Sequence, residues 1–223
     1  MAVSHQPASS RPLRADAERN RARLLEAAGE LFARKGLSVG LDEIARHAGV
    51  GVGTAYRRFP DKEQLVDSLF ESELDAIVRG AEEALAMADP WEAVVHLFTS
   101  GLERAAANVG LLQLITGSRH GAAKVDRARD RLGPLTNEVI ERARAAGVVR
   151  PDAAAQDVPV TMMMLAPLIE AGREIAPDLW RRHLALILDG LRADVSGRGA
   201  LPPTVADDAM GELLVASHRP RSA

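Results

Sequence analysis

The stretch from Leu41 to Leu69 constrains the fold most, because its residues predict two short helices joined by a tight turn. Gly49 can end the first helix, since glycine adopts the left-handed conformation found just beyond many helix C-termini. The second helix is predicted over about Val52–Phe59 and ends before Pro60. Asp61 can then cap a longer helix that follows directly. Two short helices separated by a tight turn are typical of a helix-turn-helix arrangement.

The side chains of the second predicted helix suit both a phosphate backbone and the edges of bases. The helix begins at the small residues Gly51 and Gly53, whose neighbouring free amides and positive dipole end favour a phosphate. Arg57 and Arg58 follow, and an arginine can donate two hydrogen bonds to one guanine. One of the two is therefore predicted to read a guanine. The alternative is that both bind only phosphate, because half or more of protein–DNA hydrogen bonds go to the backbone.

The rest of the sequence also has a helical pattern. Hydrophobic residues make up 47% of the chain but aromatic residues only 3%, a composition that favours helices over sheets. A first helix is predicted to end at Lys35–Gly36, with one apolar face formed by Leu24, Leu25, Ala28, Leu31 and Phe32. Further helices are predicted over residues 62–88, 91–108, 111–116, 122–146, 153–171 and 178–194. The predicted fold class is all-α, with an N-terminal three-helix head that contains the helix-turn-helix and a C-terminal helical body.

Composition divides the chain into four predicted regions. These are a flexible arm (residues 1–15), a helix-turn-helix head (16–76), a helical body (77–195) and a flexible tail (196–223) with a short helix near Met210–Val215. Arg11 and Arg14 of the arm can enter a DNA minor groove. The alternative for the arm is a disordered terminus whose charge is incidental.

The charges of the chain are unevenly distributed. The net charge is −3, which at first argues against a polyanionic partner. However, residues 11–62 contain 11 Lys and Arg against 7 Asp and Glu, whereas the remaining residues contain 17 against 24. The N-terminal part therefore carries the positive charge expected of a surface that binds nucleic acid.

Several other protein classes are disfavoured by what the sequence lacks. It contains no cysteine, which excludes disulfides, thiolate catalysis and cysteine-ligated metals. The histidines have no metal-ligand spacing, and the acidic and histidine residues show no catalytic signature. We therefore expect no metal, no cofactor and no enzyme activity. The N-terminus has no apolar signal core and no apolar run reaches the length of a membrane span, which predicts a cytoplasmic protein.

Residues 19–69 resemble the TetR family of transcriptional regulators. The resemblance is carried by RxRLLEAAGELFARKG, LDEIARHAGV and GVGTAYRRFPDKEQL. Within these segments the residues that coincide at fixed offsets are Ala27, Phe32, Gly36, Ile44, Ala45, Gly49, Val50, Tyr56, Phe59, Lys62 and Leu65. The GVGxxYRRFP segment is similar to the SbtR-like branch of that family.

The resemblance implies roles for residues of the head. Thr54, Tyr56 and Lys62 fall where family members contact phosphates. The groove-lining positions are Val52, Gly53, Arg57 and Arg58. The chain departs from the family at Gly40 and Gly51, because most members begin both short helices with a serine or threonine. Glycine costs only a few tenths of a kcal/mol relative to these caps, so we expect an intact fold and a lower operator affinity.

For the body, the resemblance implies a homodimer that binds a palindromic operator and a small, largely apolar effector. The predicted dimer seam on the last two helices comprises Leu165, Leu168, Ile169, Leu184, Ile187, Leu188 and Leu191. The predicted pocket comprises Trp91, Phe98, Leu102, Leu112, Ile115, Met162 and Met163. His96, Arg119 and His120 could orient a polar group of a ligand. The alternative for each of these residues is an ordinary packing or surface role.

The expected mechanism is repression that a ligand relieves. An effector that prefers a conformer with misplaced heads lowers DNA affinity by its differential affinity. The helix that starts at Lys62 joins head to body and is the expected lever. The alternative function is a helical adaptor that binds another protein through its apolar faces. Salt-sensitive, sequence-selective DNA binding separates the two functions.

Overall fold

The structure, a computed structural model, describes residues 11–116 and 122–193, and most of these residues are helical. The elements are α1 (Arg11–Lys35), the 3₁₀ turn η1 (Gly36–Ser38), α2 (Leu41–His47), α3 (Val52–Arg58), α4 (Lys62–Ala86), α5 (Pro90–Ala107), α6 (Val109–Ile115), α7 (Ala122–Ala145), α8 (Asp157–Gly172) and α9 (Leu179–Leu191). Extended pairing within the described ranges is limited to one isolated bridge, Val149–Arg192. The prediction of an all-α fold is confirmed.

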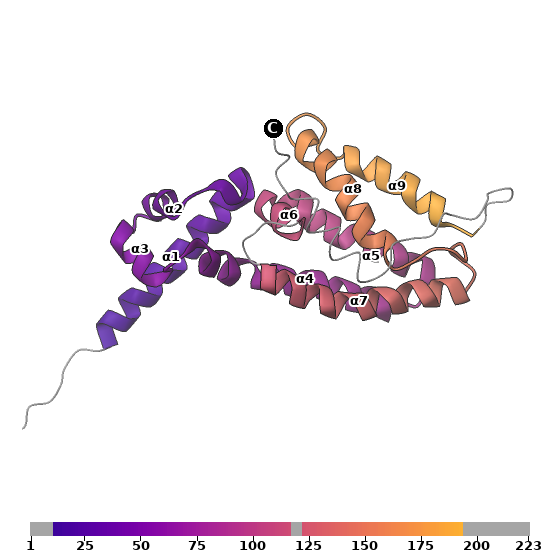
Figure 1. Cartoon of the computed structure of the whole chain (residues 1–223), viewed down its shortest axis with the longest axis horizontal. Coiled ribbons are helices and arrows are strands. Elements are labelled where there is room, and N and C mark those ends of the chain that lie inside the picture. The colour runs from indigo at the N-terminus through magenta and orange to yellow at the C-terminus, as the bar shows by residue number, and fades with distance from the viewer. Residues whose placement is uncertain (1–10, 117–121, 194–223) are drawn as a thin grey trace, which may run out of the picture.

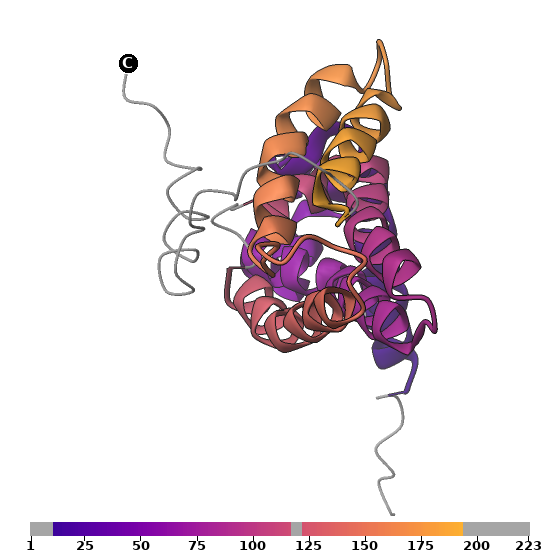
Figure 2. The same ribbon diagram turned by 90° about the vertical axis from the view of Figure 1, so that its right-hand side faces the viewer.

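The helices divide into a head and a body that α4 connects (Figure 1). The head holds α1, α2 and α3, and α4 runs from it along the whole length of the body. There α4 packs against α5 and α7. The view turned by 90° shows α8 and α9 on the opposite side of the body from α7 (Figure 2). The last two helices are therefore placed far from α3.

Two helix starts differ from the sequence-based prediction. α1 begins at Arg11, so residues 11–15, predicted as part of a flexible arm, are helical. α8 begins at Asp157 instead of near Ala153, because the Asp157 carboxylate accepts a hydrogen bond from the Ala154 amide (2.9 Å) and holds the preceding residues in a turn. The predicted tail of residues 196–223 and its helix near Met210 lie outside the described residues.

Polar caps fix where α4, α5 and α6 begin. The Asp61 carboxylate accepts a hydrogen bond from the Gln64 amide at 2.8 Å, as predicted for the N-cap of α4. Asp89 does the same for the amides of Trp91 and Glu92, with Pro90 in the first turn of α5. Asn108 caps α6. Such caps satisfy amides that lack an intrahelical partner.

The hydrophobic core of the head continues into the body. One cluster of buried side chains contains the inner faces of α1 to α4 and also includes Leu111 and Leu114 of α6 and Val125 of α7. At its centre the rings of Phe32 and Phe70 stack with centroids 6.1 Å apart. A second cluster fills the body among α4, α5, α7, α8 and α9. Head and body therefore share buried surface instead of meeting through a flexible linker.

Close contacts at the end of α1 tie the head to three body helices. Gly110 allows α6 to approach α1, since a Cβ at this position would lie 2.9 Å from the Phe32 Cβ and 3.2 Å from the Phe32 carbonyl oxygen. The Leu37 amide donates to the Gln113 side chain of α6 at 2.7 Å. Arg173, just after α8, donates to the carbonyls of Ala33 (3.4 Å) and Ala106 (3.2 Å).

Candidate DNA-reading helix and ligand cavity

The turn between α2 and α3 follows from a single glycine. Gly49 has φ +62°, the left-handed conformation that other residues rarely adopt. Its amide donates to the Arg46 carbonyl (3.2 Å), and the Val50 amide donates to the Ala45 carbonyl (2.9 Å). The chain thus leaves α2 and enters α3 within a few residues, which sets the angle between the two helices.

The N-terminus of α3 is unobstructed. Gly51 occupies the N-cap with extended φ and ψ, and no side chain caps the helix. A Cβ at Gly53 would meet nothing within 4 Å. Gly40 caps α2 in the same way, without a side-chain hydrogen bond. The two departures from the family pattern thus leave the α2 and α3 starts intact and expose backbone amides.

α3 has a buried face and an exposed face. Ala55 and Phe59 are buried against the head, and the Arg21 guanidinium of α1 lies 5.7 Å from the centre of the Phe59 ring. Val52 and Tyr56 are among the few large hydrophobic side chains exposed on the described residues. Gly53 and Arg57 are also exposed on this face, and Thr54 beside them is partly exposed.

The two arginines of α3 have different partners. The Arg57 guanidinium donates to the Thr54 hydroxyl at 2.9 Å, so it remains over the exposed face of α3. The Arg58 guanidinium donates through Nε to the Ala17 carbonyl of α1 at 3.2 Å. Arg57 therefore lies on the exposed face of α3, whereas Arg58 holds α3 to α1.

Two of the predicted phosphate contacts have intramolecular partners. The Lys62 ammonium donates to the Leu37 carbonyl and lies 5.9 Å from the centre of the Phe32 ring. Burial lowers the pKa of Lys62. A hydrogen bond to the Asp42 carboxylate raises the pKa of the Tyr56 phenol. Lys62 is therefore directed toward the end of α1 rather than outward, whereas Tyr56 remains exposed.

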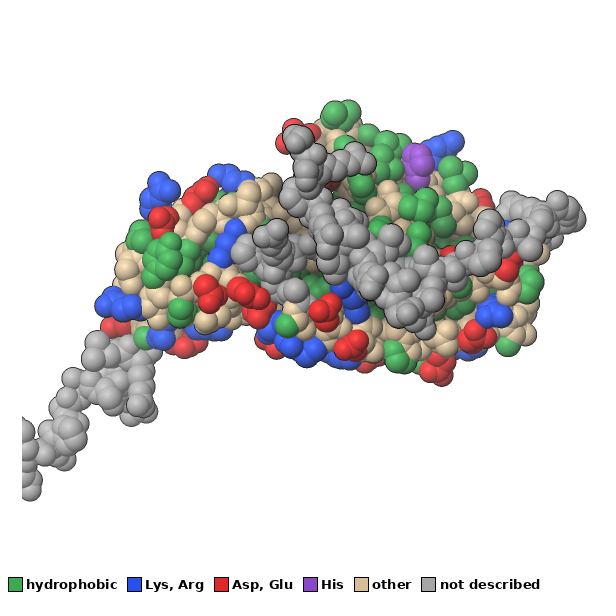
Figure 3. Space-filling model, in the orientation of Figure 1, with side chains coloured by type: hydrophobic (Ala, Val, Ile, Leu, Met, Phe, Trp, Pro, Cys, Tyr) green, Lys and Arg blue, Asp and Glu red, His purple; other side chains and the backbone are tan. Residues whose placement is uncertain are grey.

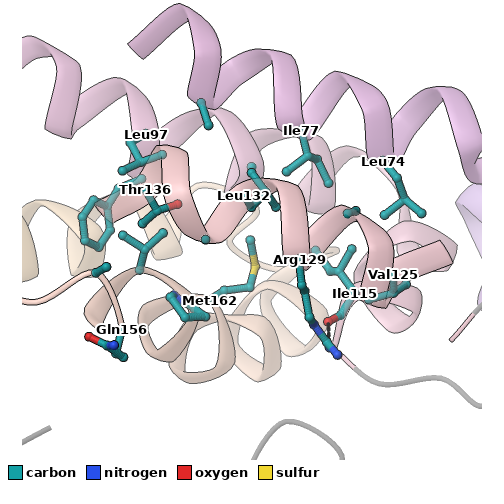
Figure 4. Close-up of a pocket in the computed structure, with 18 of the residues that line it drawn as sticks. Leu74, Ile77, Leu97, Ile115, Val125, Arg129, Leu132, Thr136, Gln156 and Met162 are labelled. Atoms are coloured by element: carbon teal, nitrogen blue, oxygen red, sulfur yellow. Dashed lines mark hydrogen bonds between the residues drawn. The ribbon is translucent and has the colours of Figure 1, made fainter. Parts of the chain in front are cut away.

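A cavity of about 910 Å³ lies in the body among α4, α5, α6, α7 and α8 (Figure 4). Five of the seven predicted pocket residues line it: Phe98, Leu102, Ile115, Met162 and Met163. Leu112 and Trp91 do not line it. Leu112 is buried in the core of the body, and the Trp91 ring lies 4.0 Å from the Arg192 guanidinium.

Of the polar residues predicted to orient a ligand, His96 does not line the cavity. Its ring lies 3.4 Å from the Glu83 carboxylate. Arg119 and His120 lie outside the described residues. The wall instead includes a side of α7 that the sequence analysis did not assign, with Arg129, Leu132 and Thr136 (Figure 4). The one sequence signal for this wall was Pro134 inside a helical pattern.

Most of the predicted dimer seam faces the interior of the chain itself. Leu165, Ile169, Leu184, Leu188 and Leu191 are buried, while Leu168 and Ile187 are partly buried. The large apolar side chains that are exposed here are Met164 (62%), Ile175 (88%), Leu179 (37%) and Leu186 (58%). In the single chain the predicted stripe packs α8 and α9 onto the body, and its role in a dimer stays a prediction. Figure 3 shows hydrophobic side chains on the surface over these two helices.

No group of three or more potential metal ligands occurs among residues 11–116 and 122–193. No helix in that part of the chain is both long and apolar enough to cross a bilayer.

Two family models match successive parts of the chain. Residues 24–69 match bacterial regulatory proteins of the tetR family, and residues 89–193 match the C-terminal domain of SbtR-like transcriptional regulators. The first match contains the helix-turn-helix, and the second contains most of the cavity wall.

Solved and curated proteins agree with these matches. A TetR transcription regulatory protein from Mycobacterium vanbaalenii is 37% identical over 81% of this chain and 99% of its own, with a TM-score of 0.51. A TetR transcriptional regulator from Streptomyces coelicolor is 29% identical over 78% of this chain and 99% of its own, with a TM-score of 0.55. An HTH-type transcriptional regulator of Staphylococcus aureus (strain USA300) is 37% identical over 30% of this chain, which spans only 36% of that relative's length.

Proposed function

Because the chain belongs to the TetR family of bacterial regulatory proteins, we propose that it binds a palindromic DNA operator as a homodimer and represses transcription until a small molecule enters the body cavity. Its family and its relatives are transcription regulators, so the chain is not an enzyme. The observation that carries the proposal is the exposed face of α3, where open amides at the N-terminus lie beside Thr54 and Arg57. Hydroxyl, guanidinium and backbone amide groups on one exposed helix face are the chemistry with which a helix reads a major groove.

Arg57 is expected to contribute more to sequence reading than Arg58. Replacing Arg57 with alanine should lower the affinity for the preferred duplex by about 10–100-fold and relax the preference at one base pair. Arg58→Ala should weaken binding less, because Arg58 already donates to the backbone of α1. The measurement is selection from random duplexes, followed by titration of the selected duplex at several salt concentrations.

A matched control is Arg79→Ala, which removes an exposed arginine from the body part of α4. It should leave operator affinity unchanged. If no inverted repeat is enriched and the wild-type chain binds DNA only weakly, the adaptor function replaces the regulator function. If Arg58→Ala and Arg57→Ala weaken binding equally, the assignment of Arg57 as the reading residue is wrong.

The dimer is proposed to form through the exposed faces of α8 and α9. Met164 and Leu186 are large apolar side chains that remain exposed on these helices in the single chain, and contiguous exposed apolar surface is typical of an interaction site. Two such helices from each protomer would form a four-helix interface. That arrangement must place two α3 helices about 34–36 Å apart to fit successive major grooves.

α6 is the proposed link between cavity and head. Ile115 and Thr116 at its C-terminal end line the cavity, and Gln113, two residues before Ile115, accepts the hydrogen bond from the Leu37 amide of the head. A ligand that displaces the end of α6 would move this contact. α4 also lines the cavity through Leu74 and Ile77, so two helices can transmit the change to α3.

The Gln113 contact gives a direct test of this link. Gln113→Ala is expected to destabilise the head–body contact by about 1 kcal/mol, because the Leu37 amide loses its acceptor. The measurement is amide hydrogen exchange at Leu37, which should become faster. Gln113→Glu keeps an acceptor oxygen and should preserve slow exchange. Equal exchange in the alanine variant and the wild type would contradict the role of Gln113.

A further inference from the structure

The cavity has polar groups at both ends and apolar side chains between them. Arg129 lies at one end, beside Val125 and Ile115, whereas Thr136 lies near Gln156 at the other (Figure 4). Ile77, Leu132 and Met162 occupy the middle. Both polar side chains come from α7, seven residues apart, which corresponds to about 10 Å along a helix. The cavity is therefore shaped for an elongated molecule with two polar ends.

The end at Arg129 offers a positive group that is partly withdrawn from water. Its side chain is 28% exposed and donates to the Asp126 carboxylate (3.1 Å) and to the Ile115 carbonyl (3.4 Å). A guanidinium has five N–H donors, so donors remain for a third partner. The Asp126 side chain is 65% exposed and lies toward solvent. Of these two charged side chains, Arg129 is therefore the more buried.

The carboxylates beside Arg129 do not prevent it from binding an anion. Asp126 and Asp130 both line the cavity but are exposed, where water screens their charge. Asp126 can turn to solvent when a ligand carboxylate replaces it at Arg129. A charge-assisted, two-point hydrogen bond between carboxylate and guanidinium is among the strongest that a half-buried arginine can make.

The end at Thr136 offers a neutral hydroxyl. Thr136 is one of the two buried polar residues of the described chain, with 7% of its surface exposed. Its hydroxyl makes no hydrogen bond to any residue within 11–116 or 122–193. A hydroxyl can both donate and accept, so a ligand hydroxyl or carbonyl at this end would satisfy it.

We propose that the cavity binds an elongated amphipathic carboxylate. Its carboxylate accepts hydrogen bonds from Arg129, its apolar chain contacts Ile77, Leu132 and Met162, and a hydroxyl or carbonyl group near its far end bonds with Thr136. The volume of about 910 Å³ lies near the upper end for a ligand site, which suits a chain rather than a single ring. This inference rests on the proposed role of the cavity as an effector site.

The Arg129–Ile115 contact also gives such a ligand a route to α6. When the guanidinium turns to a ligand carboxylate, the Ile115 carbonyl at the end of α6 loses a donor. That end of α6 is two residues from Gln113, which holds the Leu37 amide. Arg129 would thus both bind the ligand carboxylate and pass the effect of binding to the head through α6.

The test is isothermal titration of the full-length protein, without DNA, using molecules of matched length. Decanoate should bind at least about tenfold more tightly than decanol or decyltrimethylammonium, because only the carboxylate can pair with Arg129. An ω-hydroxydecanoate should bind more tightly than decanoate through Thr136. Equal binding of decanol, or a preference for the cation, would overturn the proposal.

Three variants assign the contacts. Arg129→Gln should remove the preference for decanoate over decanol, whereas Arg127→Gln, an exposed arginine on the same helix, should leave it unchanged. Thr136→Val should remove only the advantage of the ω-hydroxy compound. Retention of the carboxylate preference in Arg129→Gln, with helical content unchanged by circular dichroism, would overturn the proposal.

Operator titrations then separate this inference from the proposed function. If decanoate binds through Arg129 but operator affinity stays the same, the ligand class is supported and the regulatory role of the cavity fails. If no operator is found, the calorimetric result still decides the ligand class. If decanoate does not bind while operator binding is intact, the ligand class alone is wrong.

Discussion

Leu186→Glu is expected to convert the proposed dimer into a folded monomer. Leu186 is 58% exposed on α9, in the middle of the proposed dimer face. A glutamate there must be buried without a partner when two chains associate, which is strongly unfavourable. Loss of the second α3 helix should lower affinity for a palindromic operator by about 10²–10⁴-fold, because the two half-sites are no longer bound together. Sedimentation and operator titration measure the two effects.

Two comparisons make this prediction specific. Ser72→Glu adds the same charge to an exposed position of α4, a helix other than the two proposed to form the dimer face, and should leave the proposed dimer intact. Leu184→Ala changes a buried residue of the same helix and should instead reduce the free energy of unfolding by about 2–5 kcal/mol. A Leu186→Glu protein that remains dimeric would place the interface elsewhere.

Phe32→Ala is expected to destabilise the whole chain rather than the head alone. Phe32 is completely buried where α1 meets Phe70 of α4 and Gly110 of α6. Removing the ring should lower the free energy of unfolding by about 3–5 kcal/mol, which corresponds to roughly 6–20 °C in melting temperature. Because the head core includes side chains from α6 and α7, thermal unfolding should remain a single transition.

Phe32→Leu is the control for this substitution. Leucine keeps most of the buried volume, so the loss should stay below about 1.5 kcal/mol. Circular dichroism and calorimetry on both variants distinguish a packing effect from general intolerance at this position. If Phe32→Ala melts in two steps, with the body unaffected, head and body unfold independently and the shared core contributes little.

The head could be predicted from the sequence because its shape depends on local signals. Gly49 must adopt a left-handed conformation, Pro60 ends α3, and Asp61 caps α4. Each of these acts within a few residues, so the positions of α2, α3 and α4 follow without knowledge of the rest of the chain. The directions of Arg58 and Lys62 could not be predicted, because their partners, Ala17 and Leu37, come from α1 and the turn that follows it.

For the body, the helices and part of the cavity wall were predictable, but not which faces of the helices point inward. α8 is apolar on nearly every side, with Leu165 buried and Met164 exposed at adjacent positions, so periodicity could not separate an inward stripe from an outward one. The same limit explains the predicted pocket. Phe98 and Met162 line the cavity, but Trp91 is covered by Arg192 from the end of α9, a contact that no local pattern contains. Arg129 and Thr136 on α7 were missed because their role depends on which helices face them.

The continuity of the core between head and body limits how such a regulator can be recombined. An engineer who transplants residues 11–86 onto the body of another family member would also transplant Phe32. This side chain packs so closely against α6 that position 110 must be a glycine. A recipient with a larger residue there would push the α6 equivalent away from α1. A functional hybrid should therefore carry Gly110 and Gln113 with the donor segment, so the practical unit of exchange crosses the boundary between the two domains.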